Sequence, residues 1–337
     1  METKLLSNST ADLQEAAHLL KEGNVVGIPT ETVYGLAADA RNPEAVRQIF
    51  AAKGRPADNP LIVHIAKLEE LESVAVSVPE LALKLAEKFW PGPLTMILPK
   101  HPSIPAITSG GLDTVGVRMP SHLVARKLIE LSGVPIAAPS ANISGYPSPT
   151  TAQHVMRDMH GKIAAVVDGG DCCVGVESTV IALEGEDSVR ILRPGYVTKE
   201  MLETVVPHVT LDKAILHQLQ EGQTVRSPGM KYQHYSPHAH VTLIEGRWPE
   251  FAAWVQQHAE AGTYALVFDG EGADLSVPYL TYGTGDAEQA HQVFAKLREL
   301  DDIGAKRVFV RAPNPNGIGL AVYNRLIRAA GFEVIQV

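Results

Sequence analysis

Two basic side chains stand two positions apart in the segment KGRPADNPL, residues 53–61. Lys53 offers a compact charge and Arg55 a planar fork, so in an extended turn both could reach one anion. Asn59 follows, just before a proline and an apolar run. A solvated loop with two charges is the simpler interpretation of this spacing, so the pair alone does not establish a site.

The segment APSANISG, residues 138–145, strengthens the anion-site interpretation. A predicted strand ends here in short polar side chains, among them Ser140 and Asn142. Such side chains with free backbone N–H groups form a nest for phosphate oxygens, although the same residue types also favour ordinary turns. Open α/β sheets bind their ligands at the carboxyl ends of strands. We therefore expect a ligand site here.

A third cation, Arg118, falls among the apolar residues of the predicted strand TVGVRM. A partly buried arginine needs an anionic partner. A structural Asp or Glu and a ligand carboxylate would both satisfy this need, and the sequence leaves the choice open. The segments VGVESTV, residues 174–180, and RPG, residues 193–195, place Ser178 and Arg193 in a similar setting.

The elements that must position these residues alternate between extended and helical patterns. The first part of the chain predicts strands at 25–29, 60–65, 94–99, 114–119, 134–139, 164–170, 178–183 and 189–195, and helices at 11–22, 43–53, 79–90, 121–132 and 198–205. The pattern restarts with strands at 240–246, 263–270, 307–313 and 332–337 and helices at 248–261, 286–300 and 318–330. The second part predicts a small, mainly parallel, Rossmann-like α/β sheet. We expect domains at 1–208 and 241–337, joined by a linker at 209–240.

Composition narrows the class of protein. The chain has 337 residues, of which 45% are apolar, and a net charge of −9. An acidic chain does not bind nucleic acid by general phosphate neutralisation, whereas a small anion needs only a few placed cations. With no apolar run that could span a bilayer, no signal peptide, and only the adjacent Cys172 and Cys173, we expect a reduced, cytoplasmic protein without membrane contact.

Several motifs in one order resemble the YrdC-like family of threonylcarbamoyl-AMP synthases. The motifs are PTETVYGL, K-x-R at 53–55, VGVRMP, S-x-N at 140–142 and ESTV, and the segment SPGMKYQHYSP with the C-terminal part resembles the long, two-domain members. The resemblance implies a twisted mixed-sheet domain with a large concave cavity, followed by the small Rossmann-like α/β domain. G-x-x-x-x-G-K-[ST] and G-x-G-x-x-G are absent from the sequence.

The resemblance also implies an activity. Family members are nucleotidyltransferases that condense L-threonine, bicarbonate and ATP into threonylcarbamoyl-AMP and release pyrophosphate. Partner proteins then transfer the threonylcarbamoyl group to tRNAs that read codons beginning with A. Direct tRNA contact stays open, and the alternative is an RNA-binding module of the same fold without synthase activity. Mg²⁺ is expected with ATP, and no metal ligands are expected from protein side chains.

The resemblance assigns residues to the two substrates. The threonine side would consist of Thr32, His64, Arg118, the Ala138 backbone and Ser178. The ATP side would consist of Lys53, Arg55, Asn59, Thr114, Ser140, Asn142, Ser148, Arg193 and Tyr235, with Lys53 and Arg55 stabilising the reacting phosphates.

The segment SPGMKYQHYSPHAH, residues 227–240, is unusual for a linker because it carries two tyrosines and three histidines. Tyrosines suit a cover over a nucleotide, since they join an apolar body to a polar tip. We therefore expect residues 227–238 to fold over the cavity mouth, with Tyr235 reaching the nucleotide. A surface connector and a zinc site at His234, His238 and His240 are the alternatives.

Overall fold

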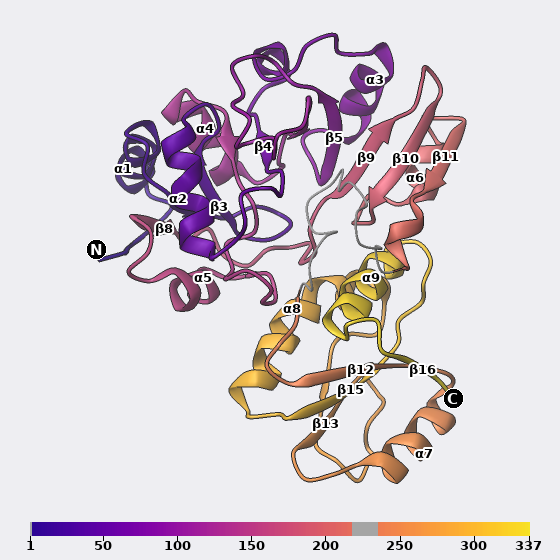
Figure 1. The fold of residues 1–337 in the computed structure, drawn as a ribbon. Coiled ribbons are helices and arrows are strands. Elements are labelled where there is room, and N and C mark those ends of the chain that lie inside the picture. The colour runs from indigo at the N-terminus through magenta and orange to yellow at the C-terminus, as the bar shows by residue number, and fades with distance from the viewer. Residues whose placement is uncertain (1, 218–234) are drawn as a thin grey trace.

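The structure is a computed structural model that describes residues 2–217 and 235–337. Two sheets organise these residues (Figure 1). An eleven-stranded sheet takes its strands from residues 4–211, and a five-stranded sheet takes its strands from residues 240–336. Both sheets agree with the α/β architecture expected from the sequence. The expected domain boundary at 208 remains a prediction, although the last strand of the first sheet ends at Leu211.

The first sheet is mixed. Its spatial order is β1-β8-β2-β3-β7-β4-β6-β5-β9-β10-β11. The strands are β1 (Lys4–Leu6), β2 (Val26–Ile28), β3 (Gly35–Asp39), β4 (Ile62–His64), β5 (Leu94–Pro99), β6 (Thr114–Arg118), β7 (Ile136–Ala137), β8 (Ala165–Val167), β9 (Thr179–Leu183), β10 (Ser188–Arg193) and β11 (His208–Leu211). Strand β4 pairs parallel with β6 and antiparallel with β7, which brings three segments distant in sequence together at the centre. All eight strands predicted for this part are present, whereas β1, β3 and β11 were not predicted.

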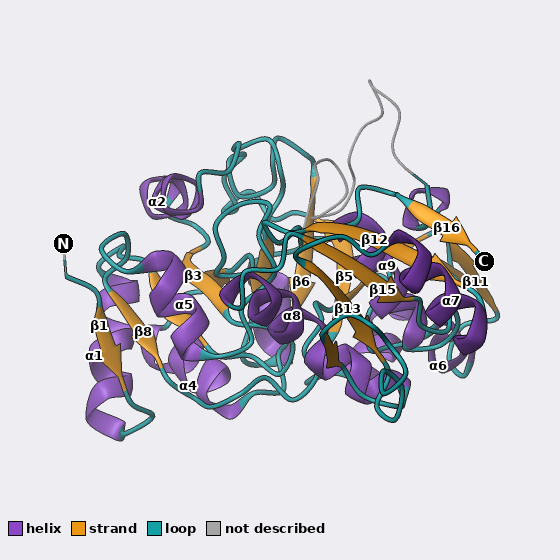
Figure 2. Cartoon of the chain, turned by 90° about the horizontal axis from the view of Figure 1, so that it is seen from below, coloured by secondary structure: helices purple, strands orange, loops and turns teal. Residues whose placement is uncertain are grey.

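Helices cover both faces of this sheet. They are α1 (Thr10–Lys21), α2 (Pro43–Lys53), α3 (Glu80–Phe89), α4 (Leu123–Ser132), α5 (Ala152–Met159) and α6 (Lys199–Glu203), with short 3₁₀ turns at Leu68–Ser73 and Lys213–Ile215. Side chains of a strand alternate between the two faces. Leu36 and Ala38 of β3 accordingly share a core with α2, while Ala37 shares a core with α1 and α4. Figure 2 shows α2 on one side and α1 and α4 on the other.

The residues at its two ends explain where helix α2 begins and ends. The side chain of Asn42 accepts hydrogen bonds from the first backbone N–H groups, and Pro43 occupies the first turn. Gly54 ends the helix with a positive φ of 62°, a conformation that costs glycine little. This stop puts Lys53 in the last turn of the helix and turns Arg55 into the loop that follows.

The second sheet is entirely parallel. Its order is β14-β13-β15-β12-β16. The strands are β12 (His240–Glu245), β13 (Thr263–Val267), β14 (Tyr279–Thr281), β15 (Arg307–Arg311) and β16 (Val334–Gln336), and the helices are α7 (Trp248–His258), α8 (Asp286–Asp302) and α9 (Gly319–Ala329). The predicted parallel sheet is confirmed, with β14 as a strand that was not predicted.

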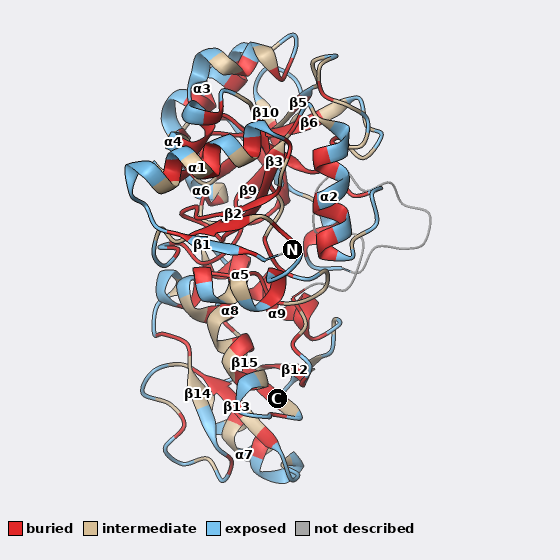
Figure 3. Cartoon of the chain, turned by 90° about the vertical axis from the view of Figure 1, so that its left-hand side faces the viewer, coloured by how far each residue is buried: buried red, intermediate tan, exposed pale blue. Residues whose placement is uncertain are grey.

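Helices α8 and α9 form the contact between the two units (Figure 3). Every residue of α9 is buried, as expected for a helix enclosed on all sides. Val33, Val174 and Val176 of the first unit share a hydrophobic core with residues of α8 and α9. Gly175 lies so close to α8 that an added Cβ would stand 2.4 Å from the Ala290 carbonyl oxygen. The two units are therefore packed closely together.

Candidate active site

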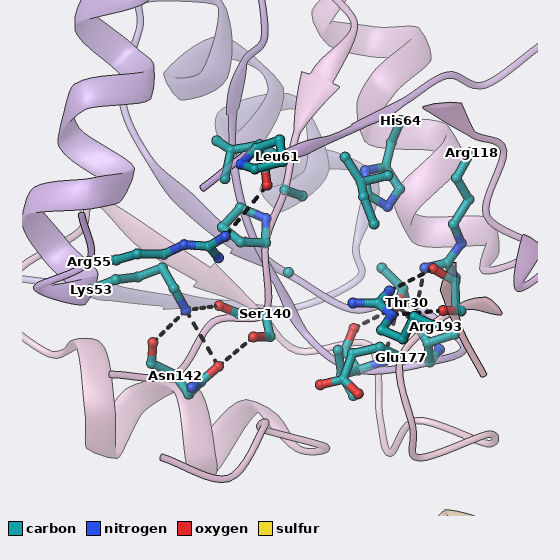
Figure 4. Close-up of a pocket in the computed structure, with 18 of the residues that line it drawn as sticks. Thr30, Lys53, Arg55, Leu61, His64, Arg118, Ser140, Asn142, Glu177 and Arg193 are labelled. Carbon is teal, nitrogen blue, oxygen red and sulfur yellow. Dashed lines mark hydrogen bonds between the residues drawn. The ribbon is translucent and has the colours of Figure 1, made fainter. Parts of the chain in front are cut away.

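A pocket at the centre of the first sheet collects most of the predicted site residues. It is partly open to solvent. The predicted residues that line it are Thr32, Lys53, Arg55, His64, Arg118, Ala138, Ser140, Asn142, Ser178, Arg193 and Tyr235. Figure 4 shows Lys53, Arg55, Ser140 and Asn142 along one side and His64, Arg118, Arg193 and Glu177 along the other.

Lys53 holds the loop after β7 in place. Its Nζ donates to the carbonyl oxygens of Ser140 and Asn142, the latter at 2.7 Å, and lies 3.4 Å from Asn142 Oδ1. Ser140 Oγ donates to the same Asn142 Oδ1 at 2.5 Å. Burial lowers the pKa of Lys53, and the neighbouring Arg55 charge lowers it further. These contacts use the three donors of the ammonium group, so Lys53 shapes the loop that lines the pocket.

Arg55 also lines the pocket, from the turn that follows α2. Its guanidinium stands 3.4 Å from the carbonyl oxygens of Asn59 and Pro60, a long distance for a hydrogen bond. The side-chain amide of Asn59 is buried behind this turn, and neither its nitrogen nor its oxygen has a hydrogen-bond partner among the described residues. Asn59 does not line the pocket, but a buried amide of this kind is suited to a ligand or water.

Arg118 pairs with a carboxylate of the protein and also lines the pocket. Its Nη2 lies 2.6 Å from Glu31 Oε1, and its Nη1 donates to Thr32 Oγ1 at 2.9 Å. Both side chains of the ion pair are only 4% exposed. Burial would raise the pKa of Glu31, but the Arg118 charge and the hydrogen bonds to the carboxylate together outweigh burial and lower it. The structural partner that the sequence left open is Glu31, and Arg118 still reaches the pocket.

His64 ends β4 next to this ion pair. Its imidazole is buried, and Nδ1 has no hydrogen-bond partner among the described residues. Burial lowers the pKa of His64 to about 3, and the nearby Arg118 charge acts in the same direction. The ring is therefore neutral at ordinary pH. A neutral imidazole with one unpaired nitrogen can accept or donate a hydrogen bond, according to its tautomer, without adding charge.

Arg193 and Ser178 form a third wall. Arg193 donates from Nε to the Ser178 carbonyl oxygen and from Nη2 to Ser178 Oγ, both at 3.1 Å. Thr95 Oγ1 lies 2.8 Å from the same hydroxyl. Gly195 lets this turn approach β9, because an added Cβ would stand 2.4 Å from Thr179 N and 2.7 Å from the Glu177 carbonyl oxygen.

Glu177 is the one acidic side chain among the lining residues of the described pocket. Its Oε1 accepts a hydrogen bond from Ser148 Oγ, and its Oε2 accepts one from Arg325 Nε at 2.7 Å. Burial would raise the pKa of Glu177, but Arg325 and Arg193 outweigh it and keep the pKa below its usual value. Glu177 is thus a buried, ionised and paired carboxylate. Ser148, predicted to contact ATP, meets Glu177 instead of lining the pocket.

Tyr235 lines the pocket from the second unit's side. The residue is 6% exposed, and its ring centroid lies 5.1 Å from that of Phe294 of α8 and 5.7 Å from the Arg325 guanidinium carbon. Ser236 N donates to the Gly145 carbonyl oxygen at 2.9 Å, next to the loop that Lys53 holds. Residues 227–234 of the expected cover, His234 of the zinc alternative among them, lie outside the described residues.

Asn59, Thr114 and Ser148 are predicted site residues that are not among the lining residues of the described pocket, and some lining residues were not predicted. Thr114 begins β6, where it pairs with Pro99, and it is not among the lining residues. Thr30, Ser144, Gly145 and Glu177 line the pocket without having been predicted. Thr30 and Glu177 belong to the quoted motifs PTETVYGL and ESTV, so the motifs contained the signal. In the parts of the chain that the structure covers, no group of three or more His, Cys, Asp or Glu could hold a metal ion. His240 instead pairs with Glu333 at 3.1 Å.

Two family models together match most of the chain. One, for Sua5, YciO and YrdC proteins and described as "Telomere recombination", matches residues 18–195. The other, described as "Threonylcarbamoyl-AMP synthase, C-terminal domain", matches residues 197–331. The two matches adjoin between β10 and β11, the last two strands of the first sheet.

Individual proteins give the same result over the full length. The chain is 46% identical over 327 residues to the threonylcarbamoyl-AMP synthase of Pyrococcus abyssi, covering 96% of this chain and 95% of that protein. It is 44% identical over 342 residues to the Bacillus subtilis enzyme of the same name, covering 99% and 97%. The crystal structure of P. abyssi Sua5 complexed with L-threonine matches all of both chains with a TM-score of 0.93 and 43% identity. The chain belongs to the Sua5/YrdC family, in its two-domain form.

Proposed function

We propose that this protein is an L-threonylcarbamoyladenylate synthase, which makes threonylcarbamoyl-AMP, pyrophosphate and water from L-threonine, bicarbonate and ATP. The observation that carries the proposal is one pocket lined by Lys53, Arg55, Arg118 and Arg193, in a chain whose full-length relatives bear this name. Such a pocket is suited to anionic substrates, and its described lining includes a single acidic side chain, Glu177, whose charge is already paired.

The threonine end of the pocket would lie at Thr32, His64, Arg118, Ala138 and Ser178. Arg118 would share its guanidinium between Glu31 and the substrate carboxylate, because a guanidinium has five N–H donors. The unpaired Nδ1 of His64 and the hydroxyl of Thr32 are candidate partners for the substrate hydroxyl or amine. The L-threonine bound in P. abyssi Sua5 supports threonine as the substrate.

The ATP end would lie at Arg55, Asn59, Ser140, Asn142, Arg193 and Tyr235. The threonine amine attacks the bicarbonate carbon and water leaves, which gives a carbamate. A carbamate oxygen then attacks the α-phosphorus of ATP, and pyrophosphate leaves. Negative charge increases on the phosphates, so fixed cations and hydrogen-bond donors stabilise the reacting state. Arg55 would meet the phosphates directly, while Lys53 would hold the Ser140–Asn142 loop that faces them.

Mg²⁺ would arrive with the nucleotide. Mg²⁺ in such sites is usually held by substrate phosphates, water and one or two carboxylates. The only acidic lining residue in the described part of the chain is Glu177, and Ser148 and Arg325 already occupy its oxygens. The donor set therefore fits a metal held by phosphates and water, and no step of this mechanism depends on a protein-bound metal.

The product would pass to proteins that transfer the threonylcarbamoyl group to tRNAs reading codons beginning with A. A mixed anhydride is labile in water, so prompt transfer fits its chemistry. Free Cys172 and Cys173 fit a reducing, cytoplasmic setting. Among the described residues, no helix combines the length and apolar character that a membrane span requires.

Release of pyrophosphate from ATP tests the proposal. We expect release to require threonine and bicarbonate together, and to fall to background when either is omitted. An RNA-binding module of the same fold would show no such dependence. Release that proceeds at the full rate without threonine would contradict the proposal.

A further inference from the structure

Arg325 reaches from the second unit to a wall of the pocket. It belongs to α9 and is fully buried. Its Nε donates to Glu177 Oε2 at 2.7 Å, and its Nη2 donates to the Pro194 carbonyl oxygen at 3.0 Å. Both acceptors lie in the first unit, in segments that carry pocket residues. A single guanidinium therefore joins the segment before β9 to the turn after β10.

The surroundings of Arg325 keep its direction fixed. Its Nη1 donates to Asn324 Oδ1 at 2.9 Å, and Asn324 in turn donates from Nδ2 to the Ile215 carbonyl oxygen at 2.6 Å. The ring of Tyr235, a lining residue, lies 5.7 Å from the guanidinium carbon. A planar guanidinium with acceptors on several sides has one orientation, which a flexible ammonium does not reproduce.

Glu177 gives this contact a consequence for the pocket. It lines the pocket beside residues proposed for ATP, since it accepts from Ser148 and lies near Arg193 and Tyr235. Arg193 already donates both of its described hydrogen bonds to Ser178. Without Arg325, the pocket would keep a buried carboxylate that has lost its directly bonded cation. Such a charge opposes a triphosphate and is itself costly to bury.

We propose that Arg325 is a positioning residue for ATP binding, which acts through Glu177 by neutralising its charge and aiming its carboxylate at Ser148. The inference rests on the proposed function, and it gives the second unit a direct part in the site. Helix α9 contributes no lining residue among those described, yet it controls the charge of the wall that faces the nucleotide.

A double-mutant comparison separates this role from ordinary packing. The readout is the Kd of a nonhydrolysable ATP analogue, measured by calorimetry on the full chain, with the melting temperature recorded for each variant. We expect Arg325→Met to weaken binding about tenfold or more, because it exposes the analogue to an unneutralised Glu177. In a Glu177→Gln background, we expect the same Arg325→Met change to alter Kd by less than about threefold. Arg325→Lys should fall between the wild type and Arg325→Met.

Arg298→Met supplies the matched control. Arg298 of α8 is also buried and pairs across the same interface, with Asp158 at 2.7 Å, but Asp158 does not line the pocket. We expect a comparable loss of melting temperature with less than a threefold change in Kd. If Arg325→Met alone fails to fold, Arg325→Lys measured in the wild-type and Glu177→Gln backgrounds completes the same cycle, with a smaller effect in the Glu177→Gln background as the expected result.

The outcomes are distinct. An equal effect of Arg325→Met in both backgrounds, or an equal effect of Arg298→Met, would show that loosened packing is the cause and would overturn the proposal. Wild-type Kd values in Arg325→Met would overturn it as well. A wild-type protein that binds no ATP analogue would overturn the proposed function itself, whereas tight wild-type binding leaves only the role of Arg325 in question.

Discussion

Lys53 and Arg55 stand two residues apart in the sequence but make different contacts in the structure. Lys53 Nζ faces the carbonyl oxygens of Ser140 and Asn142, whereas the Arg55 guanidinium lies 3.4 Å from the carbonyl oxygens of Asn59 and Pro60. The sequence suggested one anion held by both side chains. The burial of Lys53 in the structure favours a division, in which one cation shapes the loop and the other meets the phosphates.

This division predicts different failures for the two substitutions. Arg55→Ala should raise KM for ATP by roughly 10- to 150-fold, since a charge-assisted hydrogen bond contributes about 1.5–3 kcal/mol. Its melting temperature should stay close to that of the wild type. Lys53→Met should lower activity and melting temperature together, because the loop carbonyls lose their donors. A Lys53→Met protein with unchanged stability would show that the lysine does not hold the loop.

His64 makes the stability of the protein depend on pH. Its folded pKa of about 3 lies below the ordinary value of 6.5, so the unfolded chain binds the proton more readily. The stabilising contribution is complete above about pH 6.5 and is lost as the pH falls toward 3. Arg118 and Glu31 are the charged groups that face His64. The pKa of the Glu31 carboxyl lies below its ordinary value, so Glu31 gains its proton at a lower pH than an ordinary glutamate.

Urea unfolding between pH 5 and 7 measures this contribution. The wild type should lose about 2 kcal/mol more than His64→Gln over that range, since each pH unit below the unfolded pKa costs about 1.4 kcal/mol. Other histidines contribute equally to both proteins and cancel in the comparison. Parallel pH curves for the two proteins would place His64 in a solvated or protonated state and contradict the structure.

At the scale of elements, the turn after β10 needs a residue without a side chain. A Cβ on Gly195 would stand 2.4 Å from Thr179 N and 2.7 Å from the Glu177 carbonyl oxygen, and both atoms belong to backbone that cannot move aside cheaply. Gly195→Ala should therefore displace Arg193 from Ser178. We expect a drop in kcat/KM of at least tenfold together with a lower melting temperature.

Gly185→Ala provides the comparison for that prediction. Gly185 has a positive φ, of 100°, and no atom lies within 4 Å of its added Cβ, whereas Gly195 has the close approach without a positive φ. The substitution should cost some stability through backbone strain and leave kcat/KM unchanged. An activity loss in Gly185→Ala equal to that in Gly195→Ala would mean that the close approach beside the pocket does not explain the effect.

The sequence predicted the strands and helices whose own residues show an apolar run or a capping signal. Apolar runs such as LTMILP became β5, and the Asn42–Pro43 start and Gly54 stop of α2 follow ordinary capping chemistry. Strand β3 was missed because its sequence, GLAAD, has little strand preference and depends on its neighbours β2 and β7. The sequence predicted helix α9, but it did not predict that Asn324 and Arg325 are buried at the contact between the two units.

Long-range partners explain what the sequence left undecided in the site. The strand pattern showed that Arg118 needs an anion, but its partner Glu31 lies 87 positions earlier in a loop. The motif ESTV was recognised, yet the role of Glu177 depends on Arg325, 148 positions away. Side-chain pairing across a fold is fixed by topology, which one sequence does not display. The motifs therefore predicted which segments form the pocket, but not which charged side chains pair with one another there.

At the scale of the whole molecule, the two units share one site. Tyr235 brings the start of the second unit into the pocket, and Arg325 and Arg298 pair with carboxylates of the first unit. Breaking such a buried pair by removing one partner typically costs about 3–5 kcal/mol. A chain cut after residue 217 would leave Glu177 and Asp158 without these partners. We therefore expect that fragment to be less stable and to bind ATP poorly.

The most direct test of the central claim follows the carbon of bicarbonate into the product. The protein is incubated with ATP, L-threonine, Mg²⁺ and ¹³C-labelled bicarbonate, and the nucleotides are analysed by mass spectrometry. The account predicts threonylcarbamoyl-AMP whose mass rises by one unit with the label, formed in equal amount to pyrophosphate and absent when threonine is omitted. Pyrophosphate formed with AMP as the only other nucleotide product, and no label in any adenylate, would contradict it.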